Sequence, residues 1–245
     1  MSNEMSNEQF IKSVSIDRNK VPNDSYFMKI DAVKNLDYLN FEKPITFFVG
    51  ENAGGKSTLL EAIAVAYGFN PEGGTRNYAF STYDSHSRLC DAIKITKGYR
   101  KPKWGYFLRA ESFYNVATAE MDYAETVAKI SEGYHWQSHG ESFLAVVQKN
   151  LQADSIYFFD EPETALSPQR QLTLLREIYK CAKNSSQFII VSHSPILLAM
   201  PDAAIYSFDG GKIHSCAYEE TDSYQITKMF VENREQILGY LLEGD

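Results

Sequence analysis

Short runs of β-branched and aromatic residues alternate along the chain with longer segments in which apolar residues recur every three or four positions. The runs predict strands at residues 26–30, 45–49, 93–96, 106–108, 155–159, 188–191, 204–208 and 213–217. The segments with helical spacing predict helices at residues 57–67, 117–130, 142–151, 169–182 and 225–242. Because the second half alternates strand, helix and strand, we expect an α/β fold with a mostly parallel central sheet.

Two strand pairs are expected to be antiparallel. Residues 93–96 and 106–108 are predicted to pair with each other, and residues 204–208 and 213–217 to pair through the turn at 209–211. With the strands before residue 50 forming an N-terminal antiparallel β element, the 245 residues are expected to form a single domain.

Composition narrows the class of protein. A formal charge of −8 argues against binding nucleic acid over the whole surface. The three cysteines lack paired spacing, which is typical of a reducing compartment. No apolar run approaches the roughly 18–20 residues that span a bilayer, and residues 1–10 are expected to be a flexible polar tail without features of a signal peptide. We therefore expect a soluble, cytoplasmic protein without membrane insertion.

A glycine-rich loop separates the predicted strand 45–49 from the predicted helix 57–67. It fits the phosphate-binding pattern G-x-x-x-x-G-K-[ST] at every fixed position, with the residues Gly50, Glu51, Asn52, Ala53, Gly54, Gly55, Lys56, Ser57 and Thr58. Such a loop turns its backbone N–H groups toward phosphates, the lysine adds a charge, and the Ser57 hydroxyl is a ligand for Mg²⁺. The alternative is a flexible glycine turn with a solvated lysine, but the flanking strand and helix favour phosphate binding with Mg²⁺.

Acidic residues and a histidine follow the two most apolar strands. Asp160 and Glu161 end the run 155–159, where Asp160 is expected to hold Mg²⁺ and Glu161 to polarise an attacking water. His193 follows the run 188–191 and is expected to contact the γ-phosphate or that water. Each side chain has a plainer interpretation, as a charged strand end or a surface histidine. The phosphate loop upstream favours a catalytic role for Glu161, His193 and Lys56.

These elements, in this order, resemble the ATP-binding-cassette (ABC) class of P-loop ATPases. The class has a signature of the LSGGQ type before the acidic strand, and residues 137–141 occupy that place. Ser138 and Gly140 match it, whereas Gln137, His139 and Glu141 depart from it. The resemblance implies that Ser138 and Gly140 cap ATP bound by a second subunit. The plainer alternative is a capping box at the start of a helix.

Other class features are altered in this chain. The segment 161–168 resembles the D-loop, with Ser167 where transporters usually have aspartate. Residues 59–136 contain no glutamine for a Q-loop, so Glu111 is the best positional substitute as a metal ligand. Tyr26 stands at about the distance of the adenine-stacking aromatic of the class, although a core role is equally compatible with its position.

The segment between Thr58 and Ser138 is too short for the coiled coil of an SMC-type rod. The whole pattern resembles small stand-alone bacterial ATPases of the ABC/AAA type. The resemblance implies a nucleotide-binding core at about residues 20–69 and 145–245, with an inserted lobe at about 70–144 that ends in the signature. It also implies ATP hydrolysis and an ATP-dependent homodimer that acts as a clamp on an unknown protein client.

Two other roles stay open. A motor subunit of a membrane transporter would need a membrane partner that docks on the inserted lobe. A nucleic-acid-associated or defence-system ATPase would use the basic stretch Lys97, Arg100, Lys101 and Lys103. That stretch is otherwise a solvated hairpin tip, which is the more common situation for a run of charge.

Overall fold

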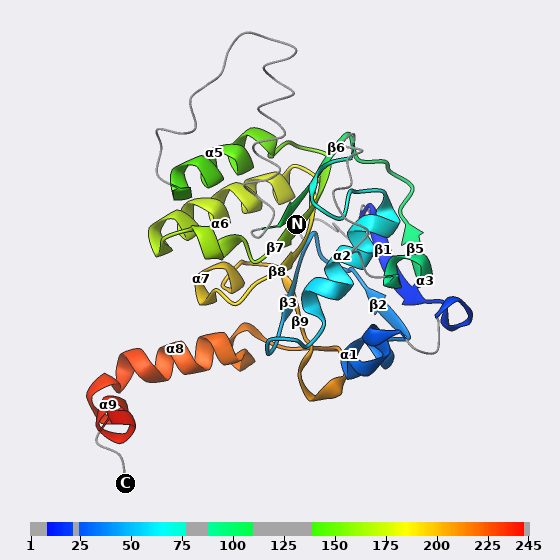
Figure 1. The fold of residues 1–245 in the computed structure, drawn as a ribbon. Helices are drawn as coiled ribbons and strands as arrows, with labels where there is room; N and C mark the ends of the chain where they lie inside the picture. The colour runs from blue at the N-terminus through cyan, green and yellow to red at the C-terminus, as the bar shows by residue number, and fades with distance from the viewer. Residues whose placement is uncertain (1–8, 22–24, 77–87, 110–138, 243–245) are drawn as a thin grey trace, which may run out of the picture.

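The main feature of the molecule is a seven-stranded sheet. The computed structural model describes residues 9–21, 25–76, 88–109 and 139–242, and within them this sheet has the order β10-β9-β3-β8-β7-β6-β4 (Figure 1). The five inner strands are parallel, and the short strands β4 and β10 pair antiparallel at the edges. The strands are β3 (Ile45–Val49), β4 (Gly74–Thr75), β6 (Trp104–Arg109), β7 (Ser155–Asp160), β8 (Gln187–Val191), β9 (Ala204–Ser207) and β10 (His214–Ser215). The predicted α/β class with a mostly parallel sheet is confirmed.

A second, three-stranded antiparallel sheet packs on one side of α2 (Lys56–Tyr67). Its order is β2-β1-β5, with β1 at Ile11–Ile16, β2 at Tyr38–Asn40 and β5 at Ile93–Lys97. The predicted pairing of residues 93–96 with 106–108 is therefore wrong, because β5 pairs with β1 while β6 pairs with β7. The predicted tail is also too long, since the side chain of Phe10 is only 1% exposed.

Alternate residues of the central strands face two separate cores. Ile156 and Phe158 pack with α2 on one face, while Tyr157 and Phe159 pack with helices on the other. That other face is covered by α5 (His139–Asn150), α6 (Pro168–Lys183) and α7 (Pro195–Leu198) (Figure 1). Since apolar residues of each strand are buried on both sides, the sheet is the rigid centre that carries the loops at its carboxyl edge.

Two predicted elements differ from the structure. Residues 26–30 were expected as a strand but form the 3₁₀-helix η2 (Tyr26–Lys29), because the N–H groups of Met28 and Ile30 bond three residues back instead of to a neighbouring strand. The predicted helix 225–242 is two helices, α8 (Asp222–Glu232) and α9 (Arg234–Leu242), which extend from the body as an arm (Figure 1).

The remaining short helices connect these elements. They are η1 (Arg18–Lys20), α1 (Asp31–Lys34), α3 (Leu89–Ala92), η4 (Pro162–Ala165), η5 (Asp209–Gly211) and η6 (Tyr218–Glu220). The predicted helix at 117–130 lies outside the described residues. The inserted lobe stays a prediction, although β6 within it belongs to the central sheet. None of the helices in the described ranges combines the length and apolarity that crossing a bilayer requires.

Candidate functional site

The glycine-rich loop joins the C-terminal end of β3 to the start of α2, as the pattern predicts. Gly50, Ala53 and Gly55 all have positive φ angles, which lets the loop turn sharply. At Gly55 a Cβ would lie 2.7 Å from Cγ2 of Ile30 and 2.9 Å from Cγ2 of Val33. The backbone angle and this close packing together require glycine at position 55.

Lys56 lies beneath the loop and is only 4% exposed. Its Nζ donates hydrogen bonds to the carbonyl oxygens of Gly50, at 2.7 Å, and Glu51, at 2.6 Å. Burial lowers the pKa of Lys56, while the charges of Glu161, Asp209 and Asp160 oppose that shift. The ammonium group is thus held inside the curve of the loop, with acidic side chains around it.

Ser57 and Asp160 are in contact, although the strand that leads to Ser57, β3, is not next to the strand that ends at Asp160, β7. β8 lies between β3 and β7, yet the Ser57 hydroxyl donates to Oδ1 of Asp160 at 2.7 Å. A hydroxyl and a carboxylate are the hard oxygen ligands that Mg²⁺ prefers. This donor set, next to a helix N-terminus and a buried ammonium group, fits a magnesium-bound nucleoside phosphate.

Glu161 and His193 face each other at the ends of β7 and β8. Oε1 of Glu161 lies 3.8 Å from Nε2 of His193, which is shielded from solvent and has no hydrogen-bond partner among the described residues. Glu161 has a φ of +48°, and its N–H donates to the carbonyl oxygen of Val191. Burial, and then the charge of Lys56, lower the pKa of His193, so the imidazole favours its neutral form.

Two carboxylates that the sequence did not single out also hold this site. Oδ1 of Asp209 accepts the N–H of Glu51 at 2.8 Å, and Ser207 donates its hydroxyl to Oδ2. Oε1 of Glu163 accepts the N–H of His193. Asp209 had been predicted only as part of a turn, and no local pattern connects it to a loop some 160 residues earlier.

The described structure gives no contact that tests the roles predicted for four further site residues. Ser138 and Glu111 lie outside the described residues. Gly140 lies in the first turn of α5. Tyr26 is 56% exposed on η2 and packs edge-to-face on Phe27. Their assigned roles stay predictions.

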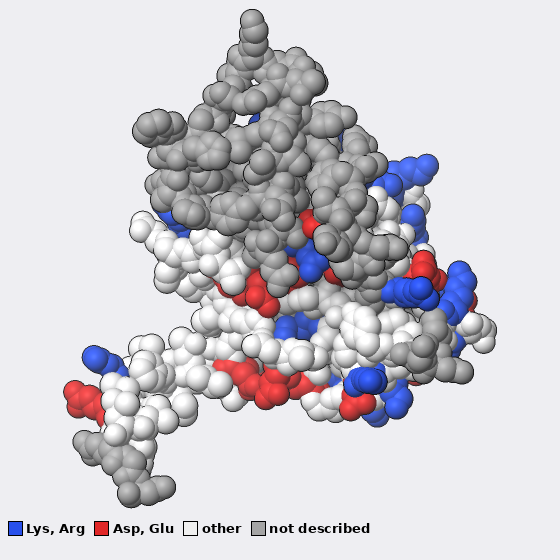
Figure 2. Space-filling model, in the orientation of Figure 1, with Lys and Arg blue, Asp and Glu red and all other residues white. Residues whose placement is uncertain are grey.

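A groove of about 1000 Å³ runs from the loop to the base of the C-terminal arm. Its wall includes Gly50, Asn52 and His193 on the body and Ile226 of α8. The charged residues that line it are acidic, namely Glu51, Asp209, Glu220 and Asp222. Figure 2 shows acidic side chains gathered on this part of the surface. The open site thus adjoins a broad acidic surface.

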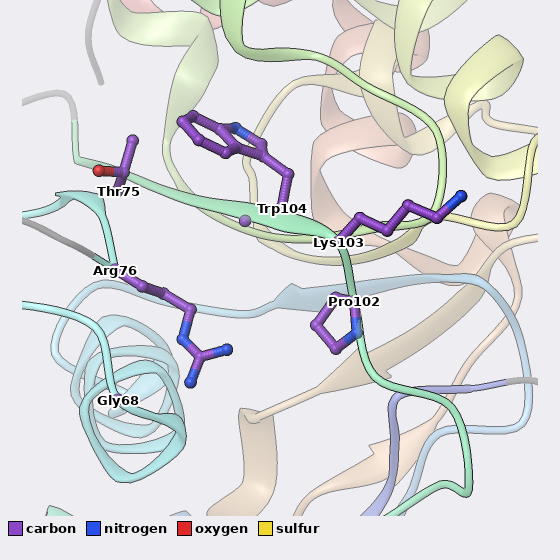
Figure 3. Close-up of a pocket in the computed structure, with 7 residues that line it drawn as sticks. Gly68, Thr75, Arg76, Pro102, Lys103 and Trp104 are labelled. Atoms are coloured by element: carbon purple, nitrogen blue, oxygen red, sulfur yellow. The ribbon is translucent and has the colours of Figure 1, made fainter.

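The basic stretch lies by a smaller hollow of about 240 Å³ at the far end of α2 (Figure 3). Arg76 extends there toward the helix end, whereas Lys103 extends away from it (Figure 3). Arg100 and Lys103 both pair with Asp154, and Lys97 lies 4.8 Å from the centroid of the Tyr67 ring. Because Lys97, Arg100 and Lys103 have partners within the chain, the geometry favours a surface connection between β5 and β6 over a nucleic-acid contact.

Residues 142–199 match the family described as "AAA domain, putative AbiEii toxin, Type IV TA system". The match covers β7, α6, β8 and α7, and so includes Asp160, Glu161 and His193. The matched segment, 58 of the 245 residues, is similar to an AAA-type domain. No curated protein matches this chain at a significant level.

Solved structures similar to this chain include two from ABC transporters and one SMC head domain. An "inward-facing conformation of a putative metal-chelate type ABC transporter" has 14% identity and a TM-score of 0.45, covering 90% of this chain and 89% of that chain. The SMC head domain from Thermotoga maritima has 11% identity and a TM-score of 0.44, covering 85% and 99%. An ATP-binding cassette of an ABC transporter has 13% identity and a TM-score of 0.47, covering 95% and 99%.

Proposed function

We propose that this protein binds ATP with Mg²⁺ and hydrolyses it to ADP and phosphate. The observation that carries the proposal is the convergence of three strand ends on one loop. The hydrogen bond from Ser57 to Asp160 joins the phosphate loop to the acidic strand, and Glu161 and His193 lie together beyond it. A phosphate loop, an oxygen donor pair and a paired acid and histidine supply the groups that phosphoryl transfer to water needs.

In the proposed mechanism the backbone of residues 50–58 and the N-terminus of α2 bind the phosphates. Lys56 neutralises negative charge on the β- and γ-phosphates. Ser57 and Asp160 would hold Mg²⁺, with Glu111 as a third oxygen donor; when bound, the ion neutralises phosphate charge. Glu161 orients the attacking water and accepts its proton, and the neutral imidazole of His193 faces Glu161 from the next strand.

The same proposal includes the assembly of two copies of the chain. The protein acts as an ATP-driven clamp in the cytoplasm, in which two copies face head to tail. Ser138 and Gly140 of one copy contact the nucleotide of the other, and Tyr26 contacts the adenine. The open groove beside the loop supports this arrangement, because the loop of a single chain leaves room of about 1000 Å³ for further protein or ligand. A homodimer follows from the symmetry of such a pair.

The chemistry is tested with two substitutions. Glu161→Gln should keep ATP affinity within about twofold and lower turnover by about 10²–10⁴, because the acid that orients water is lost. Lys56→Ala should lose affinity by about tenfold or more, because the charge facing the phosphates is gone. Titration calorimetry measures affinity and steady-state phosphate release measures turnover.

Glu177→Gln is the matched control, because that carboxylate lies on α6 and pairs with Lys180. It should leave both measurements unchanged. Phosphate release by Glu161→Gln at the wild-type rate would remove Glu161 from its role. Equal ATP affinity in Lys56→Ala and wild type would mean that the loop is not the nucleotide site.

A defence-system role is the second candidate for what the energy does. It is favoured by the family description, which names a toxin of a toxin–antitoxin system. A transporter motor is the other candidate, and it requires a membrane partner that docks on the inserted lobe. Capture of the client by Glu161→Gln loaded with ATP, followed by identification of the bound protein, separates the two: a permease supports the motor and an antitoxin supports the defence role.

A further inference from the structure

Glu163 lies in η4, two residues after Glu161, and its side chain crosses to the loop that follows β8. Its Oε1 accepts two hydrogen bonds, from the N–H of His193 at 2.5 Å and from the hydroxyl of Ser192 at 3.0 Å. Its Oε2 is shielded from solvent and has no hydrogen-bond partner among the described residues. The carboxylate therefore joins the end of the acidic strand to the backbone of His193.

The same loop is fixed from its other side. Ser192 accepts the N–H of Ser194 at 3.1 Å, and Ser194 donates its hydroxyl to Gln171 of α6 at 2.6 Å. The Ser194 hydroxyl also accepts the N–H groups that begin α7. Glu163 and Ser194 thus hold the backbone on either side of His193, while no hydrogen bond from a described residue holds Nε2 of its ring.

We propose that Glu163 is a positioning residue, which fixes the backbone of His193 so that the imidazole faces Glu161. The proposal rests on the ATPase function proposed above. Nε2 of His193 lies 3.8 Å from Oε1 of Glu161, and the backbone N–H of the same residue is bonded to Glu163. A hydrogen bond from an N–H to a side-chain oxygen is directional, so an oxygen held at this reach orients the peptide plane.

The burial of the Glu163 carboxylate supports a positioning role. Burial raises the pKa of Glu163, while the bonds from His193 and Ser192 lower it. A carboxylate at the surface would have water around both oxygens, so its contact with this loop would carry no desolvation cost.

Three substitutions at position 163 separate geometry from charge. Glu163→Gln keeps an oxygen at the same reach, so its kcat should stay within about threefold of wild type. Glu163→Asp keeps the charge but is one methylene shorter. Glu163→Ala removes both the charge and the acceptor oxygen. We expect kcat to fall about tenfold or more in the Asp and Ala variants, with KM for ATP changed less than about twofold. Glu177→Ala serves as the control for loss of a carboxylate elsewhere.

Hydrogen exchange of the His193 amide, followed by NMR, provides a readout that does not depend on turnover. The amide should be protected in wild type and Glu163→Gln and should exchange about tenfold faster or more in Glu163→Asp. Should Glu163→Ala fail to fold, the Asp variant carries both measurements. A wild type that does not release phosphate would refute the ATPase proposal, yet the exchange data would still decide the positioning role. Unchanged His193 protection in the Asp variant, or full kcat in the Asp and Ala variants of an active enzyme, would overturn it.

Discussion

At the scale of single residues, Gly55 and Gly210 share a positive φ but differ in their surroundings. Gly55 has φ of +92° and two side chains within 2.9 Å of the place of a Cβ, whereas Gly210 has φ of +68° and nothing within 4 Å. Gly210→Ala should therefore cost only the backbone strain, about 1 kcal/mol of unfolding free energy. Gly55→Ala should cost about 2–4 kcal/mol, because Ile30 and Val33 must also move. Urea unfolding measures both.

The same pair of variants also reports on function. Gly55→Ala should weaken ATP binding because it reshapes the loop, and Gly210→Ala should not. Equal unfolding free energies for the two variants would show that Ile30 and Val33 give way without cost, and that position 55 needs glycine for its backbone angle alone.

The sequence predicts those site residues that stand next to strand ends. Lys56, Ser57, Asp160, Glu161 and His193 each follow a recognisable apolar run, and parallel strands bring their carboxyl ends to one edge. Their contacts with Asp209 and Glu163 could not be predicted in the same way. The hydrogen bond to Asp209 depends on β9 lying next to β3, and the bond to Glu163 depends on β8 lying next to β7. The order of strands in the sheet cannot be predicted from local sequence.

At the scale of elements, patterns within one strand or helix were more informative than pairings between strands. β3, α2, β7, α6 and β8 lie where periodicity places them, because each buries a long apolar face. Residues 26–30 have strand-like composition, but only Phe27 of η2 is buried, so no strand forms there. β1 was not predicted, and its pairing with β5 depends on a contact about 80 residues away.

The C-terminal arm is the element that contributes least to the cores. No residue of α8 or α9 is buried, and Tyr240, Leu241 and Leu242 are 79%, 70% and 77% exposed. A chain that ends at Asn233 should therefore keep its unfolding free energy within about 0.5 kcal/mol of the full chain. Leu174→Ala on α6, at a side chain with no exposure, should instead cost about 2–5 kcal/mol.

Thermal and urea unfolding of these two variants measure the difference. A truncated chain that loses as much stability as Leu174→Ala would show that α9 packs on the body in solution.

At the scale of the whole molecule, the described residues form one side of the proposed nucleotide site. The loop, the donor pair Ser57–Asp160 and the pair Glu161–His193 all come from one edge of the sheet, and the groove beside them is open. Glu51, Asp209, Glu220 and Asp222 make that groove acidic, so a partner that closes it must neutralise or avoid this charge. A second copy that presents the N-terminus of a helix would bring a partial positive charge to the phosphates.

If the site is completed by Ser138 and Gly140 of a second copy, ATP should drive dimerisation. The effect should be clearest in Glu161→Gln, in which the closed state cannot discharge by hydrolysis. Light scattering with and without ATP and Mg²⁺ measures the mass of the particle directly. A monomer at all concentrations, from a chain whose wild type still hydrolyses ATP, would leave an ATPase that works with the residues of one chain.

Mixing two inactive variants tests the same arrangement through activity. Ser138→Arg should prevent closure, because it places a bulky charge at the contact, yet its own loop should still bind ATP. Lys56→Ala keeps its Ser138 but lacks the charge on the phosphates. A mixed dimer contains one intact site, built from Ser138 of the Lys56→Ala chain and Lys56 of the other, so mixing should restore part of the phosphate release. The recovered phosphate release should be partial, because only mixed dimers contribute to it. If each chain completes its own site, mixing should restore no activity.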